Sequence, residues 1–261
     1  MVTPMGNILP SILTATIAAA VVTTIANTGT TVYLHRALSH RALTLHPSVT
    51  WVFRLTLWLT TGIKPKEWVA VHRKHHAYTD VDGDPHSPVL LGWWRVQRLN
   101  VALYRQALSD SSLVSKYARD LPDDKWDRWF FGHNKTGLGL GIAILMVTLG
   151  PWTGLLAAFI HANVYLAGNA AVNALGHHFG KRPYPNEATN LQWLAFFTMG
   201  EGLHNNHHAA PSSARLSHRR GQIDFGWWVI RSLTSVRLAT LRFSDIRLAG
   251  GTQQASGRSA R

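Results

Sequence analysis

The sequence predicts an all-α integral membrane protein with a two-metal histidine site. Three observations support this prediction: long apolar stretches without charge, a composition suited to lipid, and three short clusters of histidine. Hydrophobic residues make up 46% of the 261 residues, charged residues only 15%, and 11 residues are tryptophan. This balance is typical of membrane proteins, in which apolar helices face lipid and tryptophan gathers at the interface.

The chain has a formal net charge of +13 and contains no cysteine. Many of its lysine and arginine residues flank apolar segments, which fits anionic lipid head groups and the positive-inside rule better than nucleic acid. We therefore expect no nucleic-acid partner. The lack of cysteine excludes disulfides, thiolate metal ligands and a cysteine-held iron–sulfur cluster. Electrons, where the chemistry needs them, have to come from elsewhere.

Residues 8–34 form the first predicted membrane helix, because they carry no charged side chain. At about 1.5 Å per residue, a helix of this length exceeds a hydrocarbon core of roughly 30 Å. A secretory signal peptide is the competing interpretation, but such peptides usually begin with basic residues, and the first seven residues contain none. The polar turn at 27–31 is expected to leave the bilayer and to carry His35 and His40 into water.

The next apolar stretch, residues 47–63, has Arg54 in its middle. If it spanned the bilayer, the first two histidine clusters would lie on opposite sides and could not share a metal centre. We therefore expect a helix in the interface, with Trp51 and Trp58 at the level of the head groups.

An acidic turn at 79–86 contains three aspartates. Their carboxylates could accept hydrogen bonds from ligand histidines, although a solvated loop explains the turn equally well. Residues 93–135 are polar and mixed in charge, and are expected to form a water-exposed helical segment.

Residues 136–172 again lack charged side chains and are interrupted at Gly150-Pro151. This predicts a helical hairpin with membrane segments at about 136–150 and 152–172. His161 lies inside it, and we favour a hydrogen bond between helices over a functional role for its imidazole. Residues 1–248 are expected to form one membrane domain, and residues 249–261 a disordered basic tail.

The three histidine clusters are His35-x4-His40, His72-x2-His75-His76 and His204-x2-His207-His208. On a helix, the pattern H-x-x-H-H places its three imidazoles on one face. A tetrahedral zinc ion accepts only four ligands, so eight converging imidazoles indicate two metal ions. A lone histidine is more often a packed or surface residue, but three clusters of matching pattern indicate ligands.

The segment that follows the predicted hairpin adds two more candidates, since Asn173 and His177 are four residues apart and share a helical face. A centre held by many neutral imidazoles stays strongly cationic, which suits an oxidising role. Its place at the ends of membrane helices indicates an apolar substrate. Oxidation of an unactivated C–H bond is the resulting hypothesis.

These motifs, in this order, resemble the membrane fatty acyl desaturases of the stearoyl-CoA (delta-9) type, from about Thr28 to Pro211. The resemblance implies a helical membrane protein with a cytosolic helical cap that holds two iron ions (Fe2+). It also implies an O2-dependent reaction that uses two electrons. The product is a cis double bond in a long-chain acyl substrate. The implied catalytic metal ligands are His35, His40, His72, His75, His76, His177, His204, His207 and His208, with Asn173 acting through a water molecule. Trp68 is a candidate wall of the substrate tunnel, or equally an ordinary interfacial tryptophan.

The chain also departs from that family pattern. Acyl-CoA members have an Arg-Asp pair just before the second cluster, where this chain has Ala70 and Val71. The substrate therefore stays open between acyl-CoA, acyl-ACP and acyl-lipid. The family usually has two membrane helices before the first cluster, and this chain has room for one. No redox domain follows the third cluster, which implies an external electron donor such as a ferredoxin, a cytochrome or a reductase.

Two alternatives to desaturation remain open at this point. A fatty acyl or lipid hydroxylase would use the same scaffold, because removal of the first hydrogen is common to both reactions. A non-enzymatic metal-binding membrane protein would need polar ligands along its membrane passes, where only His161 is found. The metal site is expected on the cytoplasmic side of the membrane, and membrane lipid is an expected partner of the protein.

Overall fold

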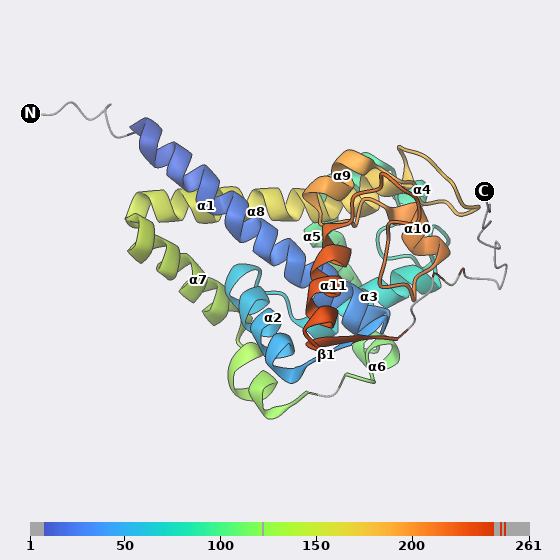
Figure 1. The fold of residues 1–261 in the computed structure, drawn as a ribbon, viewed down its shortest axis with the longest axis horizontal. Helices are drawn as coiled ribbons and strands as arrows, with labels where there is room; N and C mark the ends of the chain where they lie inside the picture. Colours follow the sequence, from blue (N-terminus) through green and yellow to red (C-terminus); the bar gives the residue numbers. More distant parts are fainter. Residues whose placement is uncertain (1–7, 122, 243–245, 247, 249–261) are drawn as a thin grey trace, which may run out of the picture.

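Helices dominate the computed structural model, which describes residues 8–121, 123–242, 246 and 248 (Figure 1). The elements in chain order are α1 (Ile8–Gly29), η2 (Thr30–Ser39), β1 (Leu43–Leu45), α2 (Pro47–Thr60), α3 (Pro65–Ala77), α4 (Pro88–Leu91), α5 (Trp93–Leu108), α6 (Leu113–Tyr117), η3 (Asp127–Phe131), α7 (Asn134–Leu149), α8 (Pro151–Ala174), η4 (Leu175–His177), α9 (Gln192–Phe197), α10 (His204–Ala209), α11 (Phe225–Ser235) and β2 (Ala239–Leu241). The predicted helical membrane class is confirmed, while the tail predicted at 249–261 lies outside the described residues.

Among the residues that the structure describes, two helices are long and apolar enough to cross a membrane. The first runs through α1 and η2 from Ile8 to Ser39, five residues past its predicted end, and the second runs from Pro151 to His177. The other arm of the predicted hairpin, α7, has only 16 residues. At about 24 Å it is shorter than the hydrocarbon core. Figure 1 shows α7 and α8 meeting at one end of the molecule, with α1 packed along α8.

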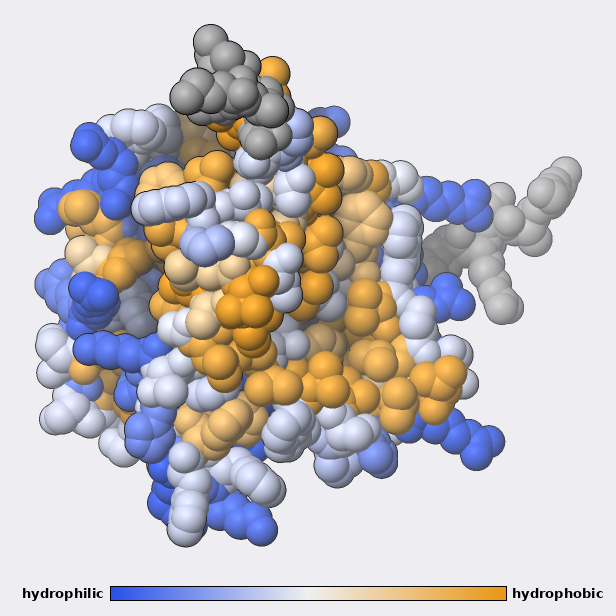
Figure 2. Space-filling model, turned by 90° about the vertical axis from the view of Figure 1, so that its left-hand side faces the viewer, coloured by the Kyte–Doolittle hydropathy of each residue, from blue (hydrophilic) through white to orange (hydrophobic). Residues whose placement is uncertain are grey.

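Large apolar side chains on these helices point outward. Val147, Trp152 and Phe159 are 86%, 84% and 65% exposed. Figure 2 views the molecule from the end where α7 meets α8, and hydrophobic residues cover much of that face. Exposed apolar surface of this extent is costly in water but suits contact with lipid.

Two glycines let α7 approach α2 closely. A Cβ atom on Gly137 would collide with the Trp58 ring, and one on Gly141 would collide with the carbonyl oxygen of Leu59. The two glycines are four residues apart, so they lie on one face of α7. Small residues at this spacing are a common means of packing membrane helices, which lack a hydrophobic driving force between them.

The charge within the predicted interfacial helix is explained by its partners. Arg54 donates to Asp124 at 2.7 and 3.0 Å and to Asp127 at 2.6 Å. Both aspartates belong to the segment that was predicted to be water-exposed. With 14 residues, or about 21 Å, α2 is too short to span a bilayer. Its place in the interface stays a prediction.

His161 joins three helices by hydrogen bonds, as the sequence indicated. Its Nε2 donates to the carbonyl oxygen of Thr60 at 2.9 Å, and its Nδ1 therefore accepts from the Thr23 hydroxyl at 2.9 Å. The imidazole thus links α8 to α1 and to the end of α2, and the interpretation as an interhelical contact is confirmed.

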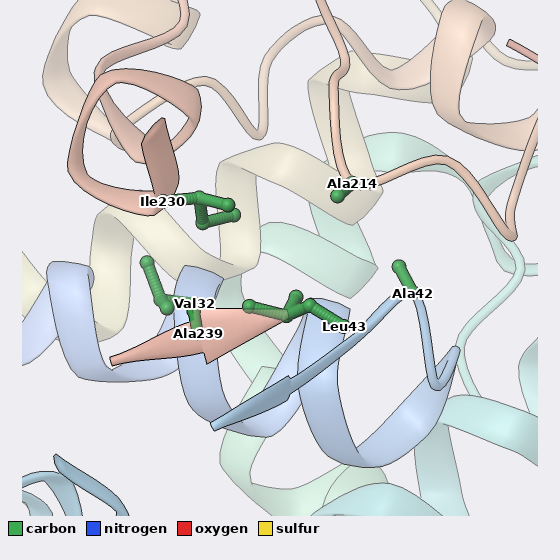
Figure 3. Packing of buried hydrophobic residues seen from close by; sticks show 6 residues of the cluster. All are labelled: Val32, Ala42, Leu43, Ala214, Ile230 and Ala239. Atoms are coloured by element: carbon green, nitrogen blue, oxygen red, sulfur yellow. The ribbon is translucent and has the colours of Figure 1, made fainter. Parts of the chain in front are cut away.

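The C-terminal part of the chain folds back onto the helix that follows α1. Strands β1 and β2 pair antiparallel. Figure 3 shows Ile230 of α11 beside Val32 of η2 at one side of a small apolar cluster, and Ala214 toward Ala42 at the other. The cluster consists of Val32, Ala42, Leu43, Ala214, Ile230 and Ala239. It fixes η2, which carries the first histidines, against the segment that follows the third histidine cluster.

Candidate metal centre

The five-residue spacing of the first histidine cluster is accommodated by a π-helix. In an α-helix, residues five apart point about 140° away from each other. Here η2 is a ten-residue π-helix, and the backbone N–H of His40 donates to the carbonyl oxygen of His35 at 3.1 Å. This i→i−5 bonding turns both imidazoles to one side, with ring centroids 4.9 Å apart.

One set of imidazoles, the first histidine group, has all its candidate ligand nitrogens within 4.8 Å of one another. It consists of His35, His40, His72, His76 and His207. The Nε2 atoms of His40 and His72 are 2.8 Å apart. His207 Nε2 lies 2.9 Å from His76 Nε2 and 3.1 Å from His35 Nε2. Two nitrogens bound at right angles, each about 2.1 Å from a metal, are separated by about 3.0 Å, so these spacings fit one ion.

A second histidine group gathers beside the first. It consists of His75, His177, His204 and His208. His204 Nε2 and His208 Nε2 are 3.2 Å apart. The Nε2 atoms of His75 and His177 are buried and have no hydrogen-bond partner among the described residues. Buried polar nitrogens are rarely left without a partner, so this donor set fits a second metal ion.

Each H-x-x-H-H motif is divided between the two groups. On α3, His72 and His76 belong to the first histidine group and His75 to the second. On α10 the division is reversed, since His204 and His208 belong to the second group and His207 to the first. The sequence predicted convergence of these imidazoles but not this exchange between the helices.

The acidic turn holds one histidine of α3 and one of η4. Nδ1 of His75 lies 3.0 Å from both carboxylate oxygens of Asp84, and Nδ1 of His177 lies 2.6 Å from Asp80. The prediction that these carboxylates accept hydrogen bonds from histidines is thus confirmed, whereas Asp82 is exposed. A carboxylate on Nδ1 fixes the ring and leaves Nε2 free for a metal.

Glu201 performs the same role for the first histidine group and was not singled out from the sequence. Its carboxylate lies 2.6 Å from Nδ1 of His35 and also accepts a hydrogen bond from the Thr31 hydroxyl. Burial alone would raise the pKa of Glu201, but His35 and Arg36 outweigh it and lower that pKa. The signal available was a carboxylate three residues before the third cluster.

The electrostatic surroundings keep the imidazoles neutral. Burial lowers the pKa of His72, His76 and His207 well below the ordinary value, and the neighbouring histidines lower it further. Burial opposes ionisation of Asp84, but its hydrogen bond from His75 prevails and lowers the pKa of Asp84 to about 2. Neutral imidazoles and ionised carboxylates are the protonation states that metal binding requires.

A pocket of about 460 Å³ reaches both histidine groups. His35 and His72 of the first group and His204 of the second line it, together with Trp68 and Asn173. Its other walls come from α5, α7 and α8. Most of the lining surface is apolar although many polar side chains reach it, and a cavity of this size with a mainly apolar surface is typical of a site for an apolar ligand.

The two remaining sequence candidates lie in this pocket wall. The Trp68 ring stacks on His72 with centroids 5.0 Å apart, and Asn173 is half-buried one turn before His177. A further residue was missed: His86 also lines the pocket, stacks on His75 at 4.6 Å, and has a buried Nε2 without a partner among the described residues. Nothing in the local sequence distinguishes His86 from a loop histidine.

Comparison with known proteins identifies the family. The sequence profile of the fatty acid desaturases matches residues 10–237. The chain belongs to the fatty acid desaturase family. This desaturase is 33% identical over 228 residues to delta-9 acyl-lipid desaturase 2 of Arabidopsis thaliana, covering 83% of this chain and 71% of that protein.

Two bacterial relatives show comparable similarity to the desaturase. The sn-1 stearoyl-lipid 9-desaturase of Synechocystis sp. is 28% identical over 231 residues, covering 87% of this chain and 70% of that protein. The sn-2 palmitoyl-lipid 9-desaturase of Nostoc sp. is 33% identical over 213 residues, covering 78% and 73%. The predicted resemblance and the predicted oxidoreductase activity of an acyl desaturase are confirmed. Of the activities considered from the sequence, desaturation is the one that the family description and the names of these relatives give.

Proposed function

We propose that this desaturase introduces a cis double bond at the delta-9 position of an acyl chain carried by a membrane lipid. The observation that supports this most is that both histidine groups line one largely apolar pocket, in a chain whose relatives are named as 9-desaturases of acyl lipids. The reaction uses O2 and two electrons and removes one hydrogen from each of two adjacent methylenes.

Two iron ions are the proposed cofactors. The first histidine group would hold one ion and the second group the other, and Asn173 would approach one of them through a water molecule. Imidazole is a suitable ligand for iron, and iron supplies the capacity to use O2 against an unactivated C–H bond. The protein's own contribution is to hold the imidazoles neutral and oriented through Asp80, Asp84 and Glu201.

The proposed substrate is an acyl-lipid rather than acyl-CoA or acyl-ACP. Where acyl-CoA members of the family carry an Arg-Asp pair, Ala70 and Val71 are 0% and 4% exposed. They pack in an apolar cluster with Leu113 and Ala118 and offer no charge to a CoA group. Substrate names of the relatives from Arabidopsis, Synechocystis and Nostoc support the same choice.

The pocket orients the acyl chain against the histidines. Trp68 forms a wall whose indole is fixed by stacking on His72, so a chain that passes it presents its methylenes to both histidine groups. Deeper toward the membrane, the Thr30 hydroxyl and the Tyr165 hydroxyl are 2.7 Å apart, and both residues line the pocket. We assign this pair as the floor against which the methyl end of the chain stops.

The two electrons are proposed to come from a separate ferredoxin, cytochrome or reductase. The chain has no cysteine with which to hold an iron–sulfur cluster. The histidine groups are proposed to face the cytoplasm, where such donors reside and where the basic segment around Arg219 and Arg220 would meet anionic lipid.

Expression in a host with a simple fatty-acid profile tests this function. Total lipids are analysed by gas chromatography and mass spectrometry, beside His75→Ala and His207→Ala variants and the control His178→Ala, whose exposed imidazole lies outside both histidine groups. A new delta-9 monounsaturated species should appear with the wild type and the control only. A hydroxylated product would show that the activity is hydroxylation and not desaturation. If the iron-loaded protein in the membrane forms no product with a co-expressed electron donor, the proposed acyl substrate is refuted.

A further inference from the structure

We propose that the acyl chain enters the pocket sideways from the bilayer, between α5 and α7, and that Arg105 and Lys135 bind the phosphate of a glycerophospholipid there. This inference rests on the acyl-lipid substrate proposed above and specifies its head group. It also assigns an opening and a binding site to residues outside the histidine groups.

The opening is indicated by apolar residues that line the pocket and are also exposed. Val101 of α5, Leu138 of α7 and Leu166 of α8 are 38%, 38% and 44% exposed. α5 and α7 each pack on α8, so the three residues border a gap whose base is α8. Leu138 and Leu166 belong to the apolar hairpin, which places this gap at the depth of lipid chains.

The positions of Leu138 and Leu166 along their helices place the opening in the leaflet nearest the histidines. Leu138 is one turn from the first residue of α7, and Leu166 is about two turns before the last residue of α8. The end of α8 continues into His177 of the second histidine group. The start of α7 is held to the loop before α3, because the Asn134 side chain donates to the carbonyl oxygen of Gly62 at 3.1 Å. A lipid in that leaflet would have its head group level with the polar ends of α5 and α7.

Two unpaired cations stand at that level. Arg105 is in the last turn of α5, Lys135 is in the first turn of α7, and both are exposed and line the pocket. The ion pairs of the described residues include neither of them. A third cation of the wall, Lys64, is 3.2 Å from the Glu67 carboxylate.

The charge balance at this opening fits a phosphate. The two carboxylates that line the pocket already have cationic or imidazole partners, since Glu67 pairs with Lys64 and Glu201 with His35. Arg105 and Lys135 therefore remain as uncompensated positive charge. A guanidinium can bind two phosphate oxygens at once, and an ammonium binds phosphate as a point charge. An uncharged sugar head group would leave both cations without a counter-charge.

Photo-crosslinking of lipid to the full chain in nanodiscs tests the proposal without turnover. The probe is phosphatidylglycerol with a diazirine in its acyl chain, and the test variant is Arg105→Gln with Lys135→Gln. The control variant, Arg95→Gln with Lys181→Gln, removes the same charge from exposed positions that do not line the pocket. Peptides containing Val101, Leu138 or Leu166 should be labelled in the wild type and the control, and at least fivefold less in the test variant.

Three results would overturn the proposal. Equal labelling of the test variant and the wild type would remove the phosphate site. Labelled peptides confined to other helices would remove the opening. Third, a diazirine galactolipid could label the wild type and lose that labelling in the test variant, as phosphatidylglycerol is expected to do. Competition by excess acyl-CoA could likewise depend on the two cations. Either result would assign the cations to another head group. Because labelling needs neither iron nor electrons, its failure is distinguishable from failure of the desaturation assay.

Discussion

Asp84 is bonded both to a proposed ligand and to the backbone of its own turn. It faces Nδ1 of His75 at 3.0 Å and accepts backbone N–H groups of Asp80 and His86. Removing its charge weakens the imidazole as a donor to a metal. We predict that Asp84→Asn lowers iron affinity by about 10- to 100-fold, measured by chelator competition on the purified protein.

The neighbouring Asp82→Asn is the matched control for Asp84→Asn. Asp82 lies in the same turn, is exposed, and is absent from the candidate metal groups of the described residues. It should bind iron as the wild type does. Equal affinities of the two variants would show that the carboxylate of Asp84 does not support the metal site.

His218 gives a pH-dependent stability that is independent of the metal ligands. Burial, and then Arg215, lower its pKa from 6.5 to about 4. The unfolded chain therefore takes up a proton as the pH falls below 6.5, whereas the folded chain does so only near 4. The free energy of unfolding should fall across this window by up to about 1.4 kcal/mol per pH unit and be unaffected above it.

Thermal melting in detergent between pH 7.5 and 4.5 measures this contribution. His218→Gln should have a shallower dependence on pH than the wild type, and His133→Gln, which alters an exposed imidazole, should follow the wild type. Parallel curves for His218→Gln and the wild type would exclude a role for this imidazole.

At the scale of residues, the sequence located the histidines but not their supports. Eight imidazoles were predicted from the spacing within the three clusters, and His177 from its place four residues after Asn173, while the resemblance to desaturases implied all nine as ligands. The structure brings the nine together in two groups. Glu201 contacts His35 from a segment far along the chain, and His86 reaches His75 through the loop that follows α3. No local pattern encodes contacts of that kind.

Packing of α7 on α2 depends on the absence of a side chain at Gly141. A Cβ there would collide with the carbonyl oxygen of Leu59, while a Cβ on Gly139 would meet nothing within 4 Å. We predict that Gly141→Ala destabilises the protein by about 1–3 kcal/mol through overpacking. Gly139→Ala, on the same helix, should stabilise it by about 0.5–1 kcal/mol.

Detergent-solubilised melting curves of the two variants provide the comparison. The expected result is opposite shifts of the melting temperature for two identical chemical changes two residues apart. Shifts of the same sign would mean that α7 can move away from α2 without loss.

At the scale of elements, the apolar runs predicted the helices but not their ends or their type. The first membrane helix continues to Ser39 because η2 follows α1 without a break. A π-helix cannot be seen in hydropathy, since its side chains follow no α-helical period, although the five-residue spacing of His35 and His40 is consistent with it. Likewise, the apolar pattern of α2 does not explain Arg54, because its partners Asp124 and Asp127 come from a segment about seventy residues later.

The placement of the whole molecule in the membrane is open to direct test. The chain has no cysteine, so single cysteines can be introduced without first removing others. Trp152, at the start of α8, is 84% exposed, and Arg219 is an exposed residue beyond the third histidine cluster. We predict that a membrane-impermeant maleimide labels Trp152→Cys in intact cells and Arg219→Cys only after the membrane is opened.

Labelling of both positions from the same side would contradict a membrane-spanning α8. Labelling of Arg219→Cys alone in intact cells would keep the span and reverse the proposed orientation. The sequence predicts a cytoplasmic metal site, and this orientation stays a prediction, because the flanking lysines and arginines show a preference of the whole chain and not the position of any one loop. The sequence also predicts that the histidine clusters share one side, since they have to meet.

The exchange of histidines between α3 and α10 has a consequence for how the protein is assembled with its metals. Each of these helices supplies ligands to both proposed ions, so neither site can be formed without immobilising the scaffold of the other. The first ion to bind restricts both helices and leaves less disorder to be lost by the second. We therefore predict cooperative loading. A population given one equivalent of iron should divide into empty and fully loaded molecules, with few that carry a single ion.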